Sequence, residues 1–130
     1  MKLLLDTHTF LWLVEGSPKL SRPAAAALAD PANEAFLSVA SIWELAIKTC
    51  SPKQQLVLSD PLDRFVAKWV PVYQLTELPI LAPHALDIVN LPEHHRDPFD
   101  RILIAQARVE GMTLLSADSK FAPYQVSILW

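Results

Sequence analysis

The sequence opens with three leucines followed directly by an acid, Leu3-Leu4-Leu5-Asp6. Three consecutive large aliphatic residues predict a short strand that is buried on both faces, as in a parallel sheet covered by helices. An acid directly after such a strand would lie at the carboxyl edge of the sheet, where open α/β folds bind their ligands. The run therefore predicts an α/β fold with a polar site at one edge of its sheet.

Strand-like and helix-like segments alternate along the rest of the chain. The predicted strands are 3–5, 35–38, 74–80, 112–115 and 126–129, with a short extended piece at 56–58. The predicted helices are 8–15, 21–29, 41–48, 60–69, 84–89 and 98–110. This alternation predicts a single domain over residues 1–130, a three-layer α/β/α sandwich with a central, mainly parallel sheet of about five strands.

The composition limits the kinds of function that the chain can have. Its only two glycines, Gly16 and Gly111, exclude a glycine-rich phosphate loop, and its single cysteine, Cys50, excludes an internal disulfide. No stretch approaches the roughly 20 apolar residues of a membrane span, so we expect a cytoplasmic protein with no membrane partner. The net charge of −3 argues against a basic nucleic-acid binder, but not against an enzyme that reaches phosphates through metal ions.

Four acids are candidates for one shared site. Asp6 follows the first predicted strand, Glu44 lies one turn into the helix after the second, and Asp118 lies in the loop after the fourth. Asp100, in the first turn of the last predicted helix, joins them if that helix begins at the same edge. Clustered carboxylates repel one another, and a hard cation such as Mg²⁺ or Mn²⁺ would neutralise them. Because a metal so held activates water, we expect metal-dependent phosphodiester hydrolysis.

Five segments carry a family pattern in order along the chain. They are LLLDTH at 3–8, LSVASIWELAIK at 37–48, LPILAPHALDIVNLP at 79–92, HRDPFDRILIAQARVEG at 95–111 and LLSADSKFAPY at 114–124. Together they resemble the PIN domain family, specifically the VapC-type toxins of type II toxin–antitoxin pairs, and the 95–111 segment is the most specific. One departure is the connector 48–53, which lacks the glycine that the family often carries there.

The resemblance implies a Mg²⁺- or Mn²⁺-dependent endoribonuclease toxin that forms a homodimer and is inhibited by a cognate antitoxin protein. It implies that the catalytic and metal-binding residues are Asp6, Glu44, Asp100 and Asp118. The residues expected to support the site are Thr7, Ser41, Ser116 and, first as a helix N-cap and second in the outer metal shell, Asp97. The candidates for contact with RNA phosphates are Lys48, Arg96 and Arg101.

Each acid of the quartet also has an ordinary structural interpretation. Asp6 could cap the helix that follows it, and Asp118 could stabilise a turn. Ser41 and Glu44 match a capping box, in which the Glu44 side chain would bond back to the backbone of Ser41. Asp100 would favour the helix dipole from the first turn of its helix.

Other functions stay open at the level of sequence. An aspartyl-nucleophile phosphatase would need a second acid two residues after Asp6, where His8 stands. A receiver-like signalling domain would need a phosphoacceptor Asp after a central strand, and the 35–38 strand ends in Ser. A catalytically silent PIN-like module would act by binding alone. The adjacent His94 and His95 invite a zinc interpretation, although no third ligand is evident.

Overall fold

Five parallel strands form the centre of the computed structural model, which describes residues 1–53, 55–94 and 96–130. The order across the sheet is β3-β2-β1-β4-β5, and each neighbouring pair runs parallel. The strands are β1 (Lys2–Leu5), β2 (Glu34–Ser38), β3 (Thr76–Leu78), β4 (Thr113–Leu115) and β5 (Ser127–Leu129). All five predicted strands are therefore present, although the third, the fourth and the fifth are shorter than predicted.

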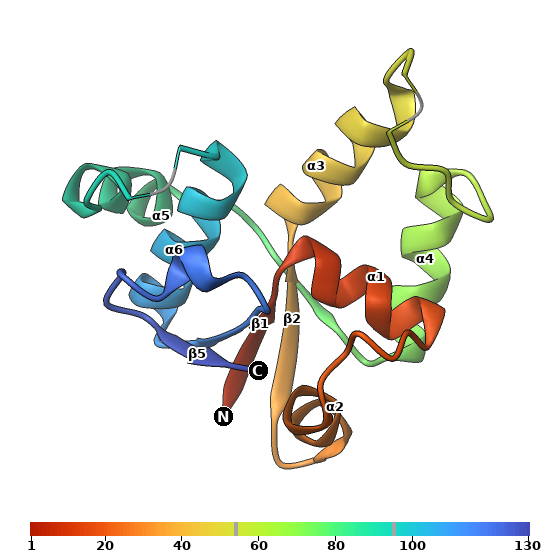
Figure 1. The fold of residues 1–130 in the computed structure, drawn as a ribbon, viewed down its shortest axis with the longest axis horizontal. Helices are drawn as coiled ribbons and strands as arrows, with labels where there is room; N and C mark the ends of the chain where they lie inside the picture. The colour runs from red at the N-terminus through yellow and green to blue at the C-terminus, as the bar shows by residue number, and fades with distance from the viewer. Residues whose placement is uncertain (54, 95) are drawn as a thin grey trace.

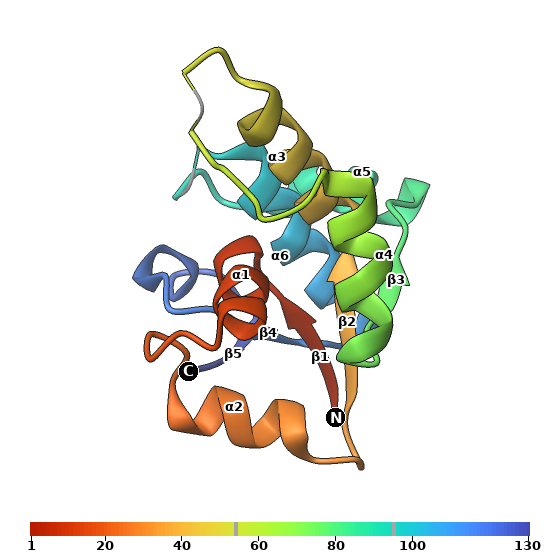
Figure 2. The same ribbon diagram turned by 90° about the vertical axis from the view of Figure 1, so that its right-hand side faces the viewer.

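Helices cover both faces of this sheet, which confirms the predicted three-layer architecture (Figures 1 and 2). The α-helices are α1 (Thr7–Glu15), α2 (Arg22–Ala29), α3 (Val39–Cys50), α4 (Leu62–Val72), α5 (Ala82–Asp87) and α6 (Pro98–Glu110). Two short 3₁₀ helices are η1 (Ile88–Asn90) and η2 (Ser119–Phe121). In Figure 1, α5 and α6 lie on one side of β1 and β2, and α1, α2 and α4 lie on the other.

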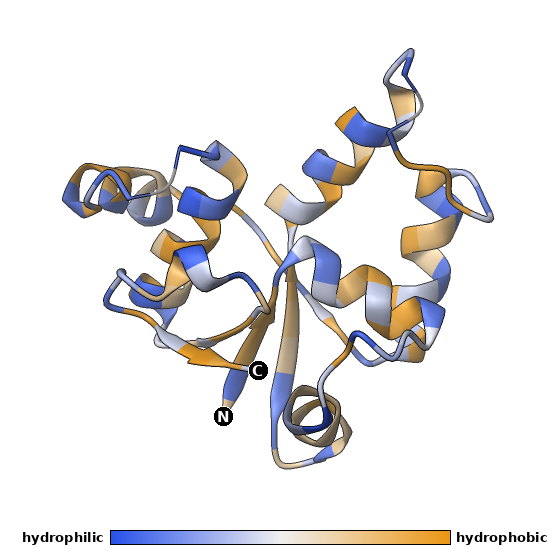
Figure 3. Ribbon diagram, in the orientation of Figure 1, coloured by the Kyte–Doolittle hydropathy of each residue, from blue (hydrophilic) through white to orange (hydrophobic). Residues whose placement is uncertain are grey.

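The three leucines of β1 divide between the two cores. Leu4 packs in the cluster that contains α6, whereas Leu3 and Leu5 pack in the cluster beneath α1 and α4, and all three are fully buried. Burying a leucine side chain contributes about 1.5–3 kcal/mol, so β1 stabilises both layers at once. In Figure 3 apolar colour runs along much of the central strands, and the helices carry mixed colour. The prediction of a strand buried on both faces is confirmed.

The strand order creates a switch point between β1 and β4. From β1 the chain builds the sheet outward through β2 and β3, and it later returns to add β4 and β5 on the other side. Ligand sites of open α/β sheets lie at the carboxyl ends of the strands at such a point. The order also differs from the 2-1-3-4-5 arrangement of receiver-like folds, which excludes that alternative.

The predicted start of the third helix is wrong. Helix α3 begins at Val39 and is capped by Ser38, whose hydroxyl accepts the N–H of Ala40 at 3.0 Å, so Ser41 lies inside the helix and no capping box forms there. The extended piece at 56–58 forms no strand in the described structure. Helix α6 has the predicted bounds, with Asp97 as its N-cap. None of the helices in the described ranges is long and apolar enough to cross a membrane.

Candidate active site

A cavity of about 220 Å³ opens at the carboxyl edge of the sheet, beside the switch point. The first turns of α1 and α6, the second and third turns of α3 and the segment after β4 surround it, and Figure 1 shows the beginnings of these helices near that edge. Acids predominate among its lining residues. They are Asp6, Thr7, His8, Glu44, Lys48, Asp97, Asp100, Asp118 and Lys120. The structure therefore brings together the four acids that the sequence analysis selected, with Asp97 as a fifth.

Asp6 is held from two sides. Its Oδ1 accepts the N–H of Thr9 at 2.7 Å, which caps α1, and its Oδ2 accepts the hydroxyl of Ser116 from the loop after β4. The Ser116 oxygen in turn accepts the N–H of Asp118 at 3.0 Å. Asp6 is only 6% exposed, so these contacts fix its carboxylate across the junction of β1 and β4. The capping interpretation of Asp6 and its place in the cavity are both correct.

Glu44 is fixed by two partners on different helices. The hydroxyl of Thr7 on α1 donates to Oε1 at 2.6 Å, and Nζ of Lys48, one turn further along α3, lies 2.8 Å from Oε2. Glu44 is 8% exposed, and its side chain makes contacts across the cavity where the capping-box interpretation required a bond to its own helix end. That interpretation is wrong because α3 begins directly after β2, at Val39, which places Ser41 inside the helix.

The beginning of α6 supplies two more carboxylates. Asp97 caps this helix by accepting the N–H of Phe99 at 2.9 Å, as predicted. Asp100 is the third residue of the helix, which follows from the N-cap and from Pro98 at the first position. Asp118, across the cavity, caps η2 by accepting the N–H of Lys120 at 2.9 Å. Each of these acids therefore stabilises a helix end as well as lining the cavity.

The environment of Asp100 disfavours the ionised form of its carboxyl group. Burial, together with the negative charges of Asp97, Glu44, Asp118 and Asp6, raises the pKa of this carboxyl from 3.8 to about 7, and burial is the largest cause. Since a neighbouring charge shifts a pKa only at short range, this shift is an electrostatic sign that the five acids share one site. Near neutral pH the Asp100 side chain exchanges a proton, and a bound cation would hold it in the ionised form.

The donor atoms of the cavity fit a hard divalent cation. Every acidic side chain offers carboxylate oxygens, the ligands that Mg²⁺ and Mn²⁺ prefer, and their mutual repulsion favours a cation among them. Asp6, Glu44, Asp100 and Asp118 could hold it. As they stand, however, no three His, Cys, Asp or Glu side chains in the described ranges are arranged to hold a metal ion, so metal binding requires side-chain movement.

The supporting residues differ in what they contact. Thr7 and Ser116 are buried and donate hydrogen bonds to Glu44 and Asp6 respectively. Ser41 is buried too, but it does not line the cavity, and its hydroxyl has no hydrogen-bond partner in the part of the chain that is described. Its supporting role stays a prediction.

The three predicted RNA contacts occupy different places. Lys48 lines the acidic cavity, where it pairs with Glu44. The guanidinium of Arg101 donates to backbone carbonyls of the 88–92 segment at 2.9–3.5 Å and so holds that segment against α6. Arg96 is exposed and lies with Arg101 at a second, mainly apolar cavity of about 500 Å³.

Sequence reasoning missed Lys120 as part of the site and gave His8 only a supporting role. Both line the acidic cavity. The position of Lys120, two residues after Asp118, was the available signal, but whether its side chain turns toward the acids depends on the turn at η2. The structure does not support the interpretation of His94 as a zinc ligand, because the His94 ring packs edge-on against Tyr124 with centroids 5.6 Å apart. His95 lies outside the described residues.

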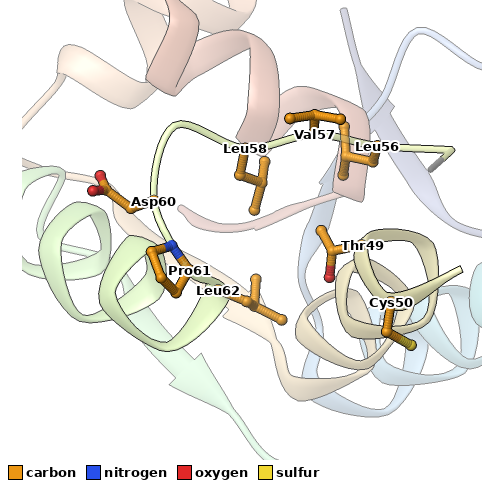
Figure 4. Close-up of a pocket in the computed structure, with 8 residues that line it drawn as sticks. All are labelled: Thr49, Cys50, Leu56, Val57, Leu58, Asp60, Pro61 and Leu62. Atoms are coloured by element: carbon orange, nitrogen blue, oxygen red, sulfur yellow. The ribbon is translucent and has the colours of Figure 1, made fainter.

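A third cavity, of about 400 Å³, lies between the end of α3 and the start of α4 (Figure 4). Its walls are mainly aliphatic, from Leu56, Val57, Leu58 and Leu62, with Cys50 and Asp60 at the rim. It shares no residue with the acidic cavity. The connector that departs from the family pattern therefore borders an apolar groove, and the acidic residues lie elsewhere.

Comparison with known proteins gives a family and a set of similar structures. The family model described as PIN domain matches residues 3–126. No curated protein matches the sequence significantly. Because the family match covers nearly the whole chain, the resemblance inferred from the five sequence segments is confirmed.

Several solved structures are similar to this chain over nearly its whole length. One is VapBC2 from Rickettsia felis bound to a DNA fragment from its promoter, with a TM-score of 0.72 and 15% identity over 99% of this chain and 98% of that one. FitAcB from Neisseria gonorrhoeae matches at 0.67 and 20% identity, covering 98% and 96%. VapBC-5 from Mycobacterium tuberculosis, a member of the VapBC family of toxin–antitoxin systems, matches at 0.60 and 18%, covering 98% and 95%. At these identities the likeness establishes the fold over the full length of the chain.

Proposed function

This chain belongs to the PIN domain family, and from that membership we propose that it is a metal-dependent endoribonuclease, the toxin of a toxin–antitoxin pair. The observation that carries the proposal is the gathering of Asp6, Glu44, Asp100 and Asp118 around one cavity. Burial and the charges of the neighbouring acids raise the pKa of Asp100 to about 7. Helix capping accounts for single acids but not for the gathering of four around one cavity, whereas a phosphodiesterase that binds Mg²⁺ or Mn²⁺ needs such a cluster.

A divalent cation bound here would offset the charge of the scissile phosphate and make a water more acidic. Asp6 and Glu44 act as rigid anchors because Thr9, Ser116 and Thr7 fix their oxygens. Asp100 must lose its proton to join them. In the proposed reaction a water oxygen bonds to phosphorus, the bond from phosphorus to the 3′ oxygen breaks, and the 3′ oxygen takes a proton. The products carry 5′-phosphate and 3′-hydroxyl ends.

Basic residues around the cavity support an RNA substrate. Lys48 and Lys120 line it, and we propose that they contact phosphates on either side of the scissile bond. Arg96 and Arg101 lie further along the same edge and are candidates for contacts to more distant phosphates. For Arg101 the contact would add to its bonds with the 88–92 carbonyls.

We propose a cognate antitoxin and a homodimer as partners. The similar structures are complexes of toxin–antitoxin type, and this chain has a surface suited to protein contacts. Val39, Trp43 and Ile47 form an exposed apolar stripe on α3, at four-residue spacing. The acidic cavity is in addition a region of strong negative electrostatic potential, which the guanidinium of an antitoxin Arg could occupy. Light scattering of the chain with and without its partner tests the assembly.

The decisive experiment is cleavage of defined RNAs by purified protein with Mg²⁺, with Mn²⁺ and with EDTA. The proposal expects cleavage that needs the metal and leaves 5′-phosphate ends. A small phosphate ester run in parallel tests the phosphatase alternative. RNA binding without cleavage under every metal condition would overturn the proposal and favour the catalytically silent module.

A further inference from the structure

The Glu44 carboxylate has no oxygen without a partner. Thr7 donates to Oε1 at 2.6 Å, and the Lys48 ammonium lies 2.8 Å from Oε2. Glu44 is thus a cavity acid that already has a cation beside it. For Glu44 to bind a metal ion through Oε2, the ammonium of Lys48 has to leave.

This pair differs from an ordinary surface pair on a helix. Exposed pairs at four-residue spacing contribute little because water screens both charges. Here the Glu44 side chain is 10% exposed and that of Lys48 is 33% exposed, so Glu44 is held on the cavity side and only Lys48 reaches solvent. The pair therefore lies where a metal ion would also bind, and water can solvate Lys48 once it is displaced.

The arrangement of the other acids agrees with this picture. No three acidic side chains in the described ranges are set as metal ligands, although five of them line the cavity. Because the Glu44 carboxylate is turned toward Lys48, it is not oriented as a metal ligand, which explains in part why these acids do not form a ready metal site. Lys120 lines the same cavity, yet no ion pair joins its ammonium to any carboxylate among the described residues.

We propose that Lys48 is an internal counter-cation of Glu44, which a divalent metal ion displaces when it binds and which is thereby released toward the substrate phosphate. This inference rests on the proposed function and concerns the regulation of metal binding at the same acidic cavity. Lys48 restrains metal binding in the free protein, and the metal frees a cation that lies beside the position of the phosphate. Because linkage is reciprocal, RNA that binds Lys48 strengthens metal binding by the same factor by which the metal strengthens RNA binding.

The test measures Mn²⁺ binding by titration calorimetry, without RNA, in wild type and in Lys48→Met, Lys48→Arg and Lys120→Met. Removing the competing ammonium in Lys48→Met should tighten Mn²⁺ binding by about five- to tenfold, more than a screened surface pair alone would give. Lys48→Arg should stay close to wild type because the guanidinium still pairs with Glu44. Lys120→Met removes the same charge from the same cavity without breaking a pair, so its gain should be about twofold at most and should vanish with added salt.

The outcomes separate the inference from the function on which it rests. Equal gains in Lys48→Met and Lys120→Met, or weaker Mn²⁺ binding in Lys48→Met, would overturn the displacement of Lys48 while metal-dependent RNA cleavage still stood. An absence of Mn²⁺ binding in all four proteins would overturn both. Circular dichroism of each variant confirms that its fold is intact before titration. Lys48→Gln, which keeps a polar end without a charge, should tighten Mn²⁺ binding in the same way as Lys48→Met.

Discussion

Thr7 on α1 and Glu44 on α3 are joined by a buried hydrogen bond of 2.6 Å, although they lie 37 positions apart in the chain. The bond connects two helices that begin at the carboxyl ends of neighbouring strands, β1 and β2. It fixes one oxygen of a carboxylate that the proposed chemistry needs. The predictions below follow from contacts of this kind.

Replacing Asp6 or Asp100 with Asn should abolish RNA cleavage and leave the fold intact. Asn keeps the side-chain oxygen that caps α1 in the case of Asp6, but it removes the charge that binds a cation. The loss should be at least about 100-fold, above the 10- to 100-fold typical of residues that only orient metal ligands. Asp63→Asn, an acid in the first turn of α4 outside the cavity, is the matched control. Cleavage by either variant at the wild-type rate would contradict the site.

Thr7→Val should weaken cleavage by about 10- to 100-fold by freeing the Glu44 carboxylate. It should also lower the free energy of unfolding by about 1–3 kcal/mol, because a buried acceptor loses its donor. Thr7→Ser retains the hydroxyl and should restore most of both quantities. Cleavage kinetics and urea unfolding of the three proteins measure the two effects, and a Val variant as active as wild type would show that Glu44 needs no such anchor.

Asp100 should make the protein, in EDTA, less stable as the pH rises. Its pKa is raised in the folded state from 3.8 to about 7, so its protonation stabilises the folded state fully below about pH 4, and this stabilisation is lost as the pH rises through 7. Urea midpoints between pH 4 and pH 8 should therefore fall more steeply in wild type than in Asp100→Asn. Mn²⁺ at pH 8 should recover the loss in wild type only. Parallel curves for the two proteins would contradict the raised pKa.

His84 should matter for stability and not for cleavage. It is fully buried, its Nδ1 accepts the N–H of Leu81 at 3.0 Å, and its Nε2 therefore carries the hydrogen that it donates to Glu110 at 2.7 Å. His84→Phe leaves both partners unsatisfied and should cost about 1–3 kcal/mol of unfolding free energy. Glu110 lies ten residues along α6 from Asp100, about 15 Å away along the helix axis, so cleavage per folded molecule should not change. A lowered rate in the folded variant would show that α5 influences the site.

The sequence predicted best where local patterns carry the information. Leucines 3–5 indicated the central strand, and Asp97, Pro98 and Gly111 mark both ends of α6 because caps depend on nearby residues alone. The start of α3 was misplaced because Ser38 and Ser41 are equally good N-caps by type, and the helix follows β2 directly with no intervening loop. Local patterns cannot make that choice.

The acids of the site could be predicted, but their partners could not. A parallel sheet gathers the residues that follow its strands, which was enough to select Asp6, Glu44 and Asp118. The bond from Thr7 to Glu44 depends on how α1 packs against α3, and the place of Lys120 depends on a turn. The contact between Phe10 on α1 and Phe65 on α4, both buried in one core cluster, likewise joins helices that lie far apart in the chain.

The central position of β1 has a consequence for the order in which the protein becomes active during synthesis. β1 pairs with β2 soon after both leave the ribosome, but its other edge waits for β4, and Ser116 reaches Asp6 across 110 positions of the chain. Until then Asp118 is absent and the field around Asp100 is incomplete. In the proposed function a growing chain therefore lacks the complete site, and RNA cleavage would begin only after nearly the whole domain has been made.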